Sequence, residues 1–309
     1  MNARNAVHPL WQGYSDSRLF EYLKKSEFMA EVRQYFESLY DSLESKNLLD
    51  KHFNDDFRHQ VPQRWWELFV GNWLLNQPTV TALSAYSNGP DFKIELDGKS
   101  CWIECVAPWP KNKNECINRQ LPAQSVAHLN SSDFVLSITD SVAKKSAKFA
   151  NYLSNKIVGM NDTHIIALSM TTSRNIDILE ANDTPILFQS LLGLGQRAIR
   201  VPVGSDSVTI PFELVQTHRF EIPKKSNAPV QTNSFLTGIH KNVSGILYSI
   251  HRYVDCPNPQ TTDLLLLHNP TAANPLPRGS LALVKEYFVE NDQLVLLSKP
   301  EHGGGVLNE

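Results

Sequence analysis

Residues 89–108 read GPDFKIELDGKSCWIECVAP, and this stretch decides the fold. Apolar and polar side chains alternate over residues 91–97, which is typical of a strand with one buried face. The Asp-Gly pair at 97–98 is a turn signal of β-hairpins. Residues 100–107 are therefore expected to return as the neighbouring strand. Pro108 ends this second strand, because proline cannot donate to a sheet ladder.

The second strand of the hairpin carries one acidic residue among apolar neighbours. Trp102, Glu104 and Val106 share one face, and the other face is wholly apolar, so we expect the strand to be buried on both sides. An uncompensated carboxylate would cost several kcal/mol there, so Glu104 requires a metal ion, a cation or strong donors beside it. Asp91 begins the adjacent strand. An Asp and a Glu on adjacent strands form a hard-oxygen site that suits Mg²⁺ or Mn²⁺ better than zinc. A buried salt bridge from Glu104 to a lysine or arginine is the alternative.

The segments around the hairpin show helical and strand patterns in turn. Residues 63–75 are apolar on nearly every side, so this helix is expected to be central. Glu67 in its middle therefore needs a partner, unless it lies on a partly wet face of the helix. The order of elements predicts an α/β protein around a mixed sheet. Further helices are expected at 18–45 (capped by Asp16 or Ser17), 140–158 and 185–192, and further strands at 79–86, 163–170, 244–250 and 263–268.

Composition excludes several classes of protein. The chain has 309 residues, of which 41% are apolar and 20% charged, so it is neither disordered nor fibrous. A net charge of −3 argues against a strongly basic coat for nucleic acid but leaves room for a local basic patch. No apolar run is long enough for a membrane span, and the first residues do not resemble a signal peptide. Four cysteines without paired spacing predict a reducing, cytoplasmic setting.

The layout of these motifs resembles the PD-(D/E)XK nuclease superfamily, which has the restriction-endonuclease-like fold. The matching residues are Pro90-Asp91 and Glu104, with Glu67 as the helix carboxylate. The stretch Trp102 to Pro108 is also similar to a bacterial branch of the superfamily in which the motif is followed by Val-Ala-Pro. The resemblance implies a nuclease-like α/β core at 58–175, after an N-terminal helical extension at 1–57. A C-terminal α+β part at 176–309 would pack on this core or complete it.

One position departs from the superfamily pattern. The usual lysine, two residues after the glutamate, is Val106 here, and valine cannot orient a water or offset charge on a phosphate. Some members of the superfamily supply the lysine from a neighbouring helix. At 100° per residue, Lys145 lies about 60° from Val142, at the edge of the apolar face of the following helix, whereas Lys144 lies about 160° away. We therefore expect Lys145 to reach the sheet and Lys144 to face solvent. The alternative is that Lys145 only extends along the helix border.

The resemblance implies a metal-dependent phosphodiester hydrolase, a nuclease acting on DNA or RNA. Asp91 and Glu104 would hold Mg²⁺ or Mn²⁺, and the backbone carbonyl of Cys105 would complete the inner shell. Glu67 would bind a second ion or orient a water ligand. Lys145 would stabilise the transition state. The predicted catalytic residues are thus Glu67, Asp91, Glu104 and Lys145.

A nucleic-acid partner would bind a local basic patch, for which Lys111, Lys113 and Lys148 are the candidates. Two other functions stay open at this stage. The first is a catalytically decayed binding protein on the same fold, favoured by the missing motif lysine and by the net charge of −3. The second is a different hydrolase that uses His268, although a strand-ending turn explains residues 268–270 equally well.

Overall fold

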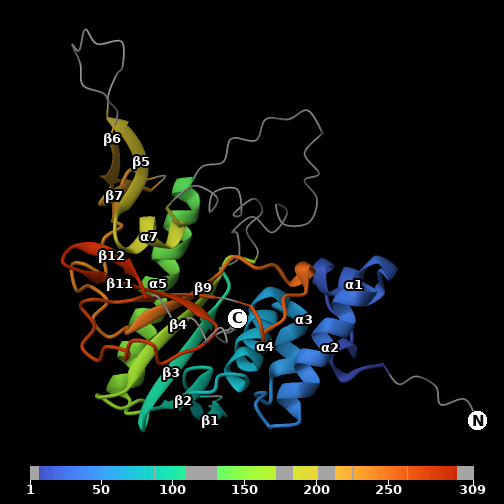
Figure 1. Cartoon of the computed structure of the whole chain (residues 1–309). Coiled ribbons are helices and arrows are strands. Elements are labelled where there is room, and N and C mark those ends of the chain that lie inside the picture. Colours follow the sequence, from blue (N-terminus) through green and yellow to red (C-terminus); the bar gives the residue numbers. More distant parts are fainter. Residues whose placement is uncertain are drawn as a thin grey trace, which may run out of the picture.

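An eight-stranded mixed sheet forms the centre of the molecule (Figure 1), in the order β1-β2-β3-β4-β9-β10-β11-β12. The structure is a computed structural model that describes residues 7–86, 88–108, 131–171, 184–200, 213–224, 226–262 and 264–297, without the side chains of 213 and 214. Helices flank the sheet, so the predicted α/β class with a mixed sheet is confirmed. The strands of this sheet are β1 (Val80–Ala85), β2 (Phe92–Leu96), β3 (Lys99–Val106), β4 (Thr163–Ser169), β9 (Gly245–Ser249), β10 (Leu264–His268), β11 (Val284–Glu290) and β12 (Gln293–Leu296).

Both directions of pairing occur in the sheet. β3 and β4 are parallel, as are β4 and β9, and β10 and β11, while the remaining neighbours are antiparallel. Helix α5 (Ser131–Ser154) lies between β3 and β4 in the chain, as a parallel crossover requires. Strands β9 to β12 come from the segment that was expected to pack on the core or complete it, and they lie in the same sheet as β1 to β4.

The central hairpin forms as the sequence predicts. Asp97 and Gly98 both have positive φ, at 49° and 74°, which the tight turn between the strands requires. On β3, Trp102 packs in the apolar cluster on the α5 side of the sheet. Ile103 and Cys105 pack in the cluster on the opposite side. The strand is thus buried on both faces, as expected.

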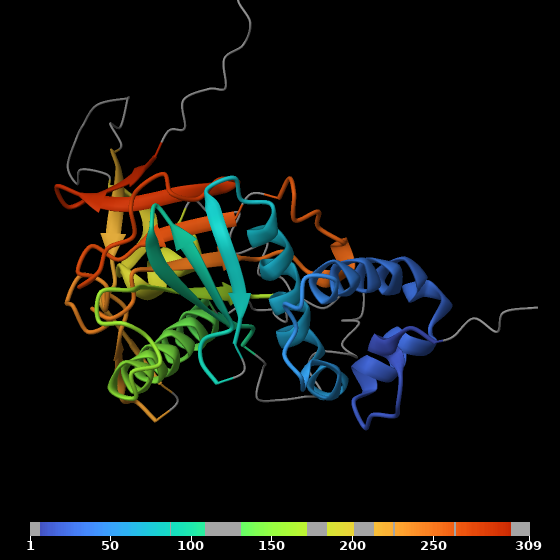
Figure 2. The same cartoon turned by 90° about the horizontal axis from the view of Figure 1, so that it is seen from below.

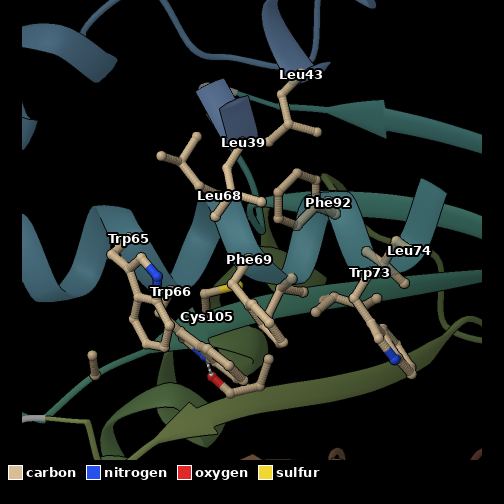
Figure 3. Packing of buried hydrophobic residues seen from close by; sticks show 14 of the residues in the cluster. Leu39, Leu43, Trp65, Trp66, Leu68, Phe69, Trp73, Leu74, Phe92 and Cys105 are labelled. Carbon is tan, nitrogen blue, oxygen red and sulfur yellow. Dashed lines mark hydrogen bonds between the residues drawn. The ribbon is translucent and has the colours of Figure 1, made fainter. Parts of the chain in front are cut away.

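Helix α4 (Val61–Leu75) is the central helix of that opposite side (Figure 3). It is buried nearly all round because it lies between the strands and helix α2 (Ala30–Glu44). The Trp66 indole donates to the carbonyl of Ala167 on β4 over 2.8 Å. A Cβ on Gly71 would lie 2.8 Å from Leu43 of α2 and 3.0 Å from Phe92 of β2, so a larger residue here would have to displace these side chains. These contacts hold α4, and Glu67 with it, against the sheet.

The prediction of one continuous helix at 18–45 is wrong, because the segment forms two helices. α1 (Arg18–Lys25) ends before Ser26, a short 3-10 turn η2 (Glu27–Met29) follows, and α2 then begins. The guanidinium of Arg33 donates to the carbonyls of Leu23 and Ser26 at 2.7 and 2.6 Å, which stabilises the break. Ser17 caps α1, as one of the two predicted caps. The 3-10 turn η1 (Pro9–Trp11) and helix α3 (Phe53–His59) were not predicted.

The other face of the sheet is covered by α5 and α7 (Ile186–Leu191), as Figure 2 shows from below. α5 begins at Ser131 rather than at Asp140, and its first turns bury Val135 and Ile138. No helix in the described ranges is long and apolar enough to cross a membrane. The remaining elements of the described residues are two small two-stranded sheets and one 3-10 turn: β5 (Leu194–Arg200) with β6 (Glu213–His218), β7 (Glu221–Pro223) with β8 (Pro229–Gln231), and η3 (Tyr253–Asp255).

Candidate active site

A cavity of about 530 Å³ lies where the hairpin, α4 and α5 meet. The four predicted catalytic side chains come from these three elements: Glu67 from α4, Asp91 and Glu104 from the hairpin, and Lys145 from α5. All four line the cavity. The structure therefore brings together residues that are far apart in the sequence.

The two hairpin carboxylates are related by the register of the strands. The ladder pairs Phe92 with Ile103, and one further step sets Asp91 opposite Glu104. Opposite residues of an antiparallel pair point to the same side. The backbone N–H of Cys105 donates to Oδ2 of Asp91 over 2.6 Å, which fixes this carboxylate at the end of the strand.

Glu104 is 1% exposed and contacts two cations. The ammonium groups of Lys145 and Lys148 both donate to its Oε1 atom at 2.6 Å. A buried Glu104 requires a compensating group, and the two lysines supply it. Their contacts are those of the buried salt bridge that was the alternative to a metal site. The orientations expected of the two helix lysines are confirmed, because Lys145 faces the sheet while the exposed Lys144 pairs with Asp140 on its own helix.

Lys148 and Tyr152 are site residues whose contacts the sequence reasoning missed. Lys148 was considered only for phosphate binding, yet it shares Glu104 with Lys145. The Tyr152 hydroxyl donates to the carbonyl of Gly89 at 2.9 Å and lies 3.5 Å from Oε2 of Glu104. Lys148 and Tyr152 follow Lys145 by three and seven residues, so the three side chains lie on one stripe of α5. This spacing is a signal in the sequence that could have identified both residues. The other two candidates for the basic patch, at 111 and 113, lie outside the described residues.

Glu67 is buried and engaged through both oxygens, so the interpretation of a partly wet helix face is wrong. The Gln63 amide donates to Oε1 over 2.8 Å, and the Arg64 guanidinium donates to Oε2 over 2.6 Å. Gln63 also donates to the Cys105 carbonyl at 3.2 Å and accepts from the Ala107 N–H at 2.8 Å. Gln63 therefore connects α4 to the end of β3, at the residue whose N–H holds Asp91.

Arg64 connects the site to the N-terminal helical segment. Its guanidinium contacts Asp50 at 2.7 Å and also Asp56 of α3, in addition to Glu67. Asp50 and Asp56 line the cavity themselves. No spacing in the sequence relates these two residues to the hairpin, so this part of the site could not be found from a motif.

The cavity carries an excess of negative charge. Five carboxylates line it, against three lysine or arginine side chains. Burial raises the pKa of Asp91 well above its usual value, and the charges of Glu67 and Glu104 raise it further, although Lys145 and the Cys105 N–H act in the opposite direction. Burial also raises the pKa of Glu67, against the effect of Arg64. The pKa values of both carboxyls are therefore raised mainly by burial in the cavity.

Asp91 and Glu104 offer carboxylate oxygens, the type of ligand that hard divalent cations such as Mg²⁺ prefer. Mg²⁺ in proteins is typically held by one or two carboxylates together with waters and substrate phosphates. Asp91 and Glu104 supply two carboxylates. Burial and the nearby carboxylates raise the pKa of the Cys105 thiol well above its usual value, so this thiol is not expected to bind the ion as a thiolate. The backbone carbonyl is then the group of Cys105 that offers the ion an oxygen ligand. Within the described ranges, no cluster of three or more His, Cys, Asp or Glu side chains could hold a metal ion.

The His268-Asn269 pair lies elsewhere in the fold. Nε2 of His268 lies 2.6 Å from Oε1 of Glu286, and both side chains are buried. The Asn269 amide donates to the carbonyls of His240 and Val243 at 3.0 and 2.8 Å. Neither His268 nor Asn269 lines the cavity. These contacts agree with the strand-ending turn that was the alternative for this motif.

Comparisons of the chain with protein-family models, with curated proteins and with solved structures found no match.

Proposed function

We propose that the protein is a metal-dependent phosphodiester nuclease with a restriction-endonuclease-like core. The observation that carries the proposal is the position of Lys145. Its ammonium lies 2.6 Å from Glu104, in the cavity that Asp91 also lines. An Asp–Glu–Lys set is thus assembled although the motif position on the strand is a valine. The helix supplies the missing cation from a residue that is remote in the chain.

Asp91, Glu104 and the Cys105 carbonyl would hold Mg²⁺ or Mn²⁺ in this proposal. Activation of a water and neutralisation of phosphate charge are the chemistry that such an ion supplies when bound. Glu67 already accepts hydrogen bonds through both oxygens. We therefore assign Glu67 the role of fixing Gln63, and through it the end of β3, rather than that of a ligand to a second ion.

The two lysines of α5 act on the phosphate in this proposal. Lys145 is the more buried of the two, with a side chain 19% exposed, and would offset the charge that develops on the phosphate oxygens. Lys148 is 46% exposed and lies nearer to solvent, where it would contact a phosphate entering the cavity. Burial lowers the pKa of Lys148, but Glu104 and Tyr152 together raise it by more, so this side chain remains cationic.

The second candidate function is a binding protein in which this site is catalytically decayed. One observation favours it: both lysines are already paired with Glu104, as in a purely structural ion cluster. In that case the cluster serves stability, and no divalent cation is needed.

Divalent-metal binding separates the two functions. We expect Mn²⁺ to raise the thermal midpoint of the wild type, because an ion that binds only the folded state stabilises it. Asp91→Asn should abolish the rise, whereas Glu95→Gln should keep it, because Glu95 lies on the same hairpin but does not line the cavity. Cleavage of labelled single-stranded and double-stranded DNA and RNA should follow the same pattern. A wild type without a metal-dependent shift and without cleavage would support the decayed binding protein.

A further inference from the structure

Two groups of elements that line the cavity carry opposite charge. The α5 wall presents Lys145 and Lys148. The facing wall is formed by α3, α4 and the turn before α3, and presents Asp50, Asp56 and Glu67. Among the described residues, the only lysine or arginine on this facing wall is an arginine that contacts all three of these carboxylates.

This asymmetry extends to the solvent side of the cavity. Lys148 on one wall is 46% exposed, and Asp56 on the other is 40% exposed, whereas Glu104 between the walls is buried. A phosphate that approaches the hairpin carboxylates would therefore meet lysines along α5 and a carboxylate along α3.

A nucleic-acid strand that passed through the cavity would carry phosphates on both sides of the bond to be cut. One of these neighbouring phosphates would then lie against Asp50 and Asp56. A strand that ends in the cavity with a free hydroxyl avoids this repulsion, because the terminal nucleoside has no phosphate beyond the bond. The volume of about 530 Å³ falls in the range of sites that hold one small-molecule-sized unit, such as a nucleotide.

We infer that the enzyme acts at the hydroxyl-bearing end of a single strand. The scissile phosphate lies along Lys145 and Lys148, and the terminal nucleoside lies against the acidic wall. His52 and Gln60 line that same wall and offer hydrogen-bonding groups to a sugar or a base. This inference rests on the proposed nuclease function and adds the substrate class to it.

The first test compares three forms of one internally labelled single strand in the presence of Mn²⁺. The forms are a linear strand with hydroxyl ends, the same strand with phosphates on both ends, and the strand closed into a circle. We expect the circle to be cut at least tenfold more slowly than the hydroxyl-ended strand, and the phosphate-ended strand at least fivefold more slowly. Equal rates on the circle and the linear strand would overturn the inference and leave the nuclease function standing.

The second test uses a matched pair of variants on α3. Asp56→Asn removes a charge from the acidic wall, whereas Asp55→Asn removes one from the adjacent residue, which is 70% exposed, pairs with Arg58 and does not line the cavity. Asp56→Asn should lower the ratio of the cleavage rates of the hydroxyl-ended and the phosphate-ended strand at least threefold. Asp55→Asn should leave this ratio unchanged. Identical ratios for both variants would overturn the role of the wall.

A binding measurement separates this inference from the chemistry. Fluorescence anisotropy in EDTA reports the affinity of each strand without cleavage. We expect the hydroxyl-ended strand to bind the wild type at least fivefold more tightly than the phosphate-ended strand. Equal affinities, or no binding of either strand, would overturn the inference. End-selective binding without cleavage of any strand under Mg²⁺ or Mn²⁺ would instead contradict the nuclease function alone.

Discussion

The ammonium of Lys145 lies 2.6 Å from Oε1 of Glu104, so a helix and a strand that are separate in the sequence share one ion pair inside the fold. β3 has no lysine beside Glu104, because the position two residues after the glutamate is Val106. α5 packs on the same face of the sheet as Glu104 and brings the cation to it. The cation and the carboxylate are therefore positioned by packing, without a local motif.

Replacing Lys145 should reduce both cleavage and stability, and the two effects can be measured separately. Lys145→Ala should reduce cleavage by at least about a hundredfold, as for the loss of one transition-state donor. It should also lower the free energy of unfolding by about 1–3 kcal/mol, because Glu104 loses one of two charged partners. Single-turnover cleavage and urea unfolding measure the two effects.

Lys144→Ala is the matched control on the same helix. Lys144 is 70% exposed and pairs with Asp140, and exposed ion pairs of this kind contribute about 0.3–0.5 kcal/mol. We expect cleavage and unfolding close to those of the wild type. Equal cleavage by the Lys144 and Lys145 variants would remove the catalytic role of Lys145.

Stability should depend on pH through Asp91 and Glu67. Both carboxyls have a raised pKa in the folded protein, with burial as the main cause. The native state therefore binds more protons than the unfolded state above the ordinary carboxyl pKa of about 4. The free energy of unfolding contributed by these two groups should be largest below this pH and should fall as pH rises through the folded pKa values.

Urea unfolding at a series of pH values tests this dependence without any metal. Asp91→Asn should flatten the fall of stability with pH, because the asparagine does not titrate. Glu95→Gln on the same hairpin should leave the slope as it is. A steeper fall in the Asp91 variant than in the wild type would contradict the expected direction of the pH dependence.

The hairpin and the central helix could be predicted because local patterns specify them. Alternation, the Asp-Gly turn and the apolar surroundings of Glu104 are all short-range signals, and the spacing of Lys145 from Val142 indicated which lysine faces the sheet. The two residues most central to the hydrogen bonding of the site, Gln63 and Arg64, escaped notice. The sequence pattern of a buried helix does not predict which strand or loop its polar residues will contact.

The N-terminal part of the site depends on tertiary packing alone. Asp50 and Asp56 reach the cavity because the aromatic residues of the N-terminal helices bury α3 beside α4, with Phe53 and Phe57 inside the core. The break in the helix expected at 18–45 also depends on a contact outside the helical pattern, because Arg33 stabilises it by donating to the carbonyls of Leu23 and Ser26. A contact of this type becomes visible only in three dimensions.

Gln63 should behave as a positioning residue. Gln63→Ala removes the hydrogen bonds to Glu67, to the Cys105 carbonyl and from the Ala107 N–H, so we expect the thermal stabilisation by Mn²⁺ to need at least tenfold more metal. Gln60→Ala, one turn earlier and exposed, should bind Mn²⁺ like the wild type. Unchanged metal affinity in Gln63→Ala would show that the end of β3 holds its geometry without this amide.

The His268–Glu286 pair should matter for stability and not for cleavage. Glu286 is buried and accepts from His268 over 2.6 Å and from the backbone N–H of Gly279 at 2.8 and 3.0 Å. His268→Ala leaves this buried carboxylate with fewer donors, so the free energy of unfolding should fall by about 1–3 kcal/mol.

Cleavage by the His268 variant, measured well below its melting temperature, should equal that of the wild type. The reason is spatial, because His268 does not line the cavity that holds Asp91 and Glu104. Glu286→Gln is the companion variant. It keeps an acceptor for Gly279 and should lose less stability than His268→Ala. A variant of His268 that folds as stably as the wild type but no longer cleaves would restore the histidine-dependent hydrolase and displace the proposed nuclease site.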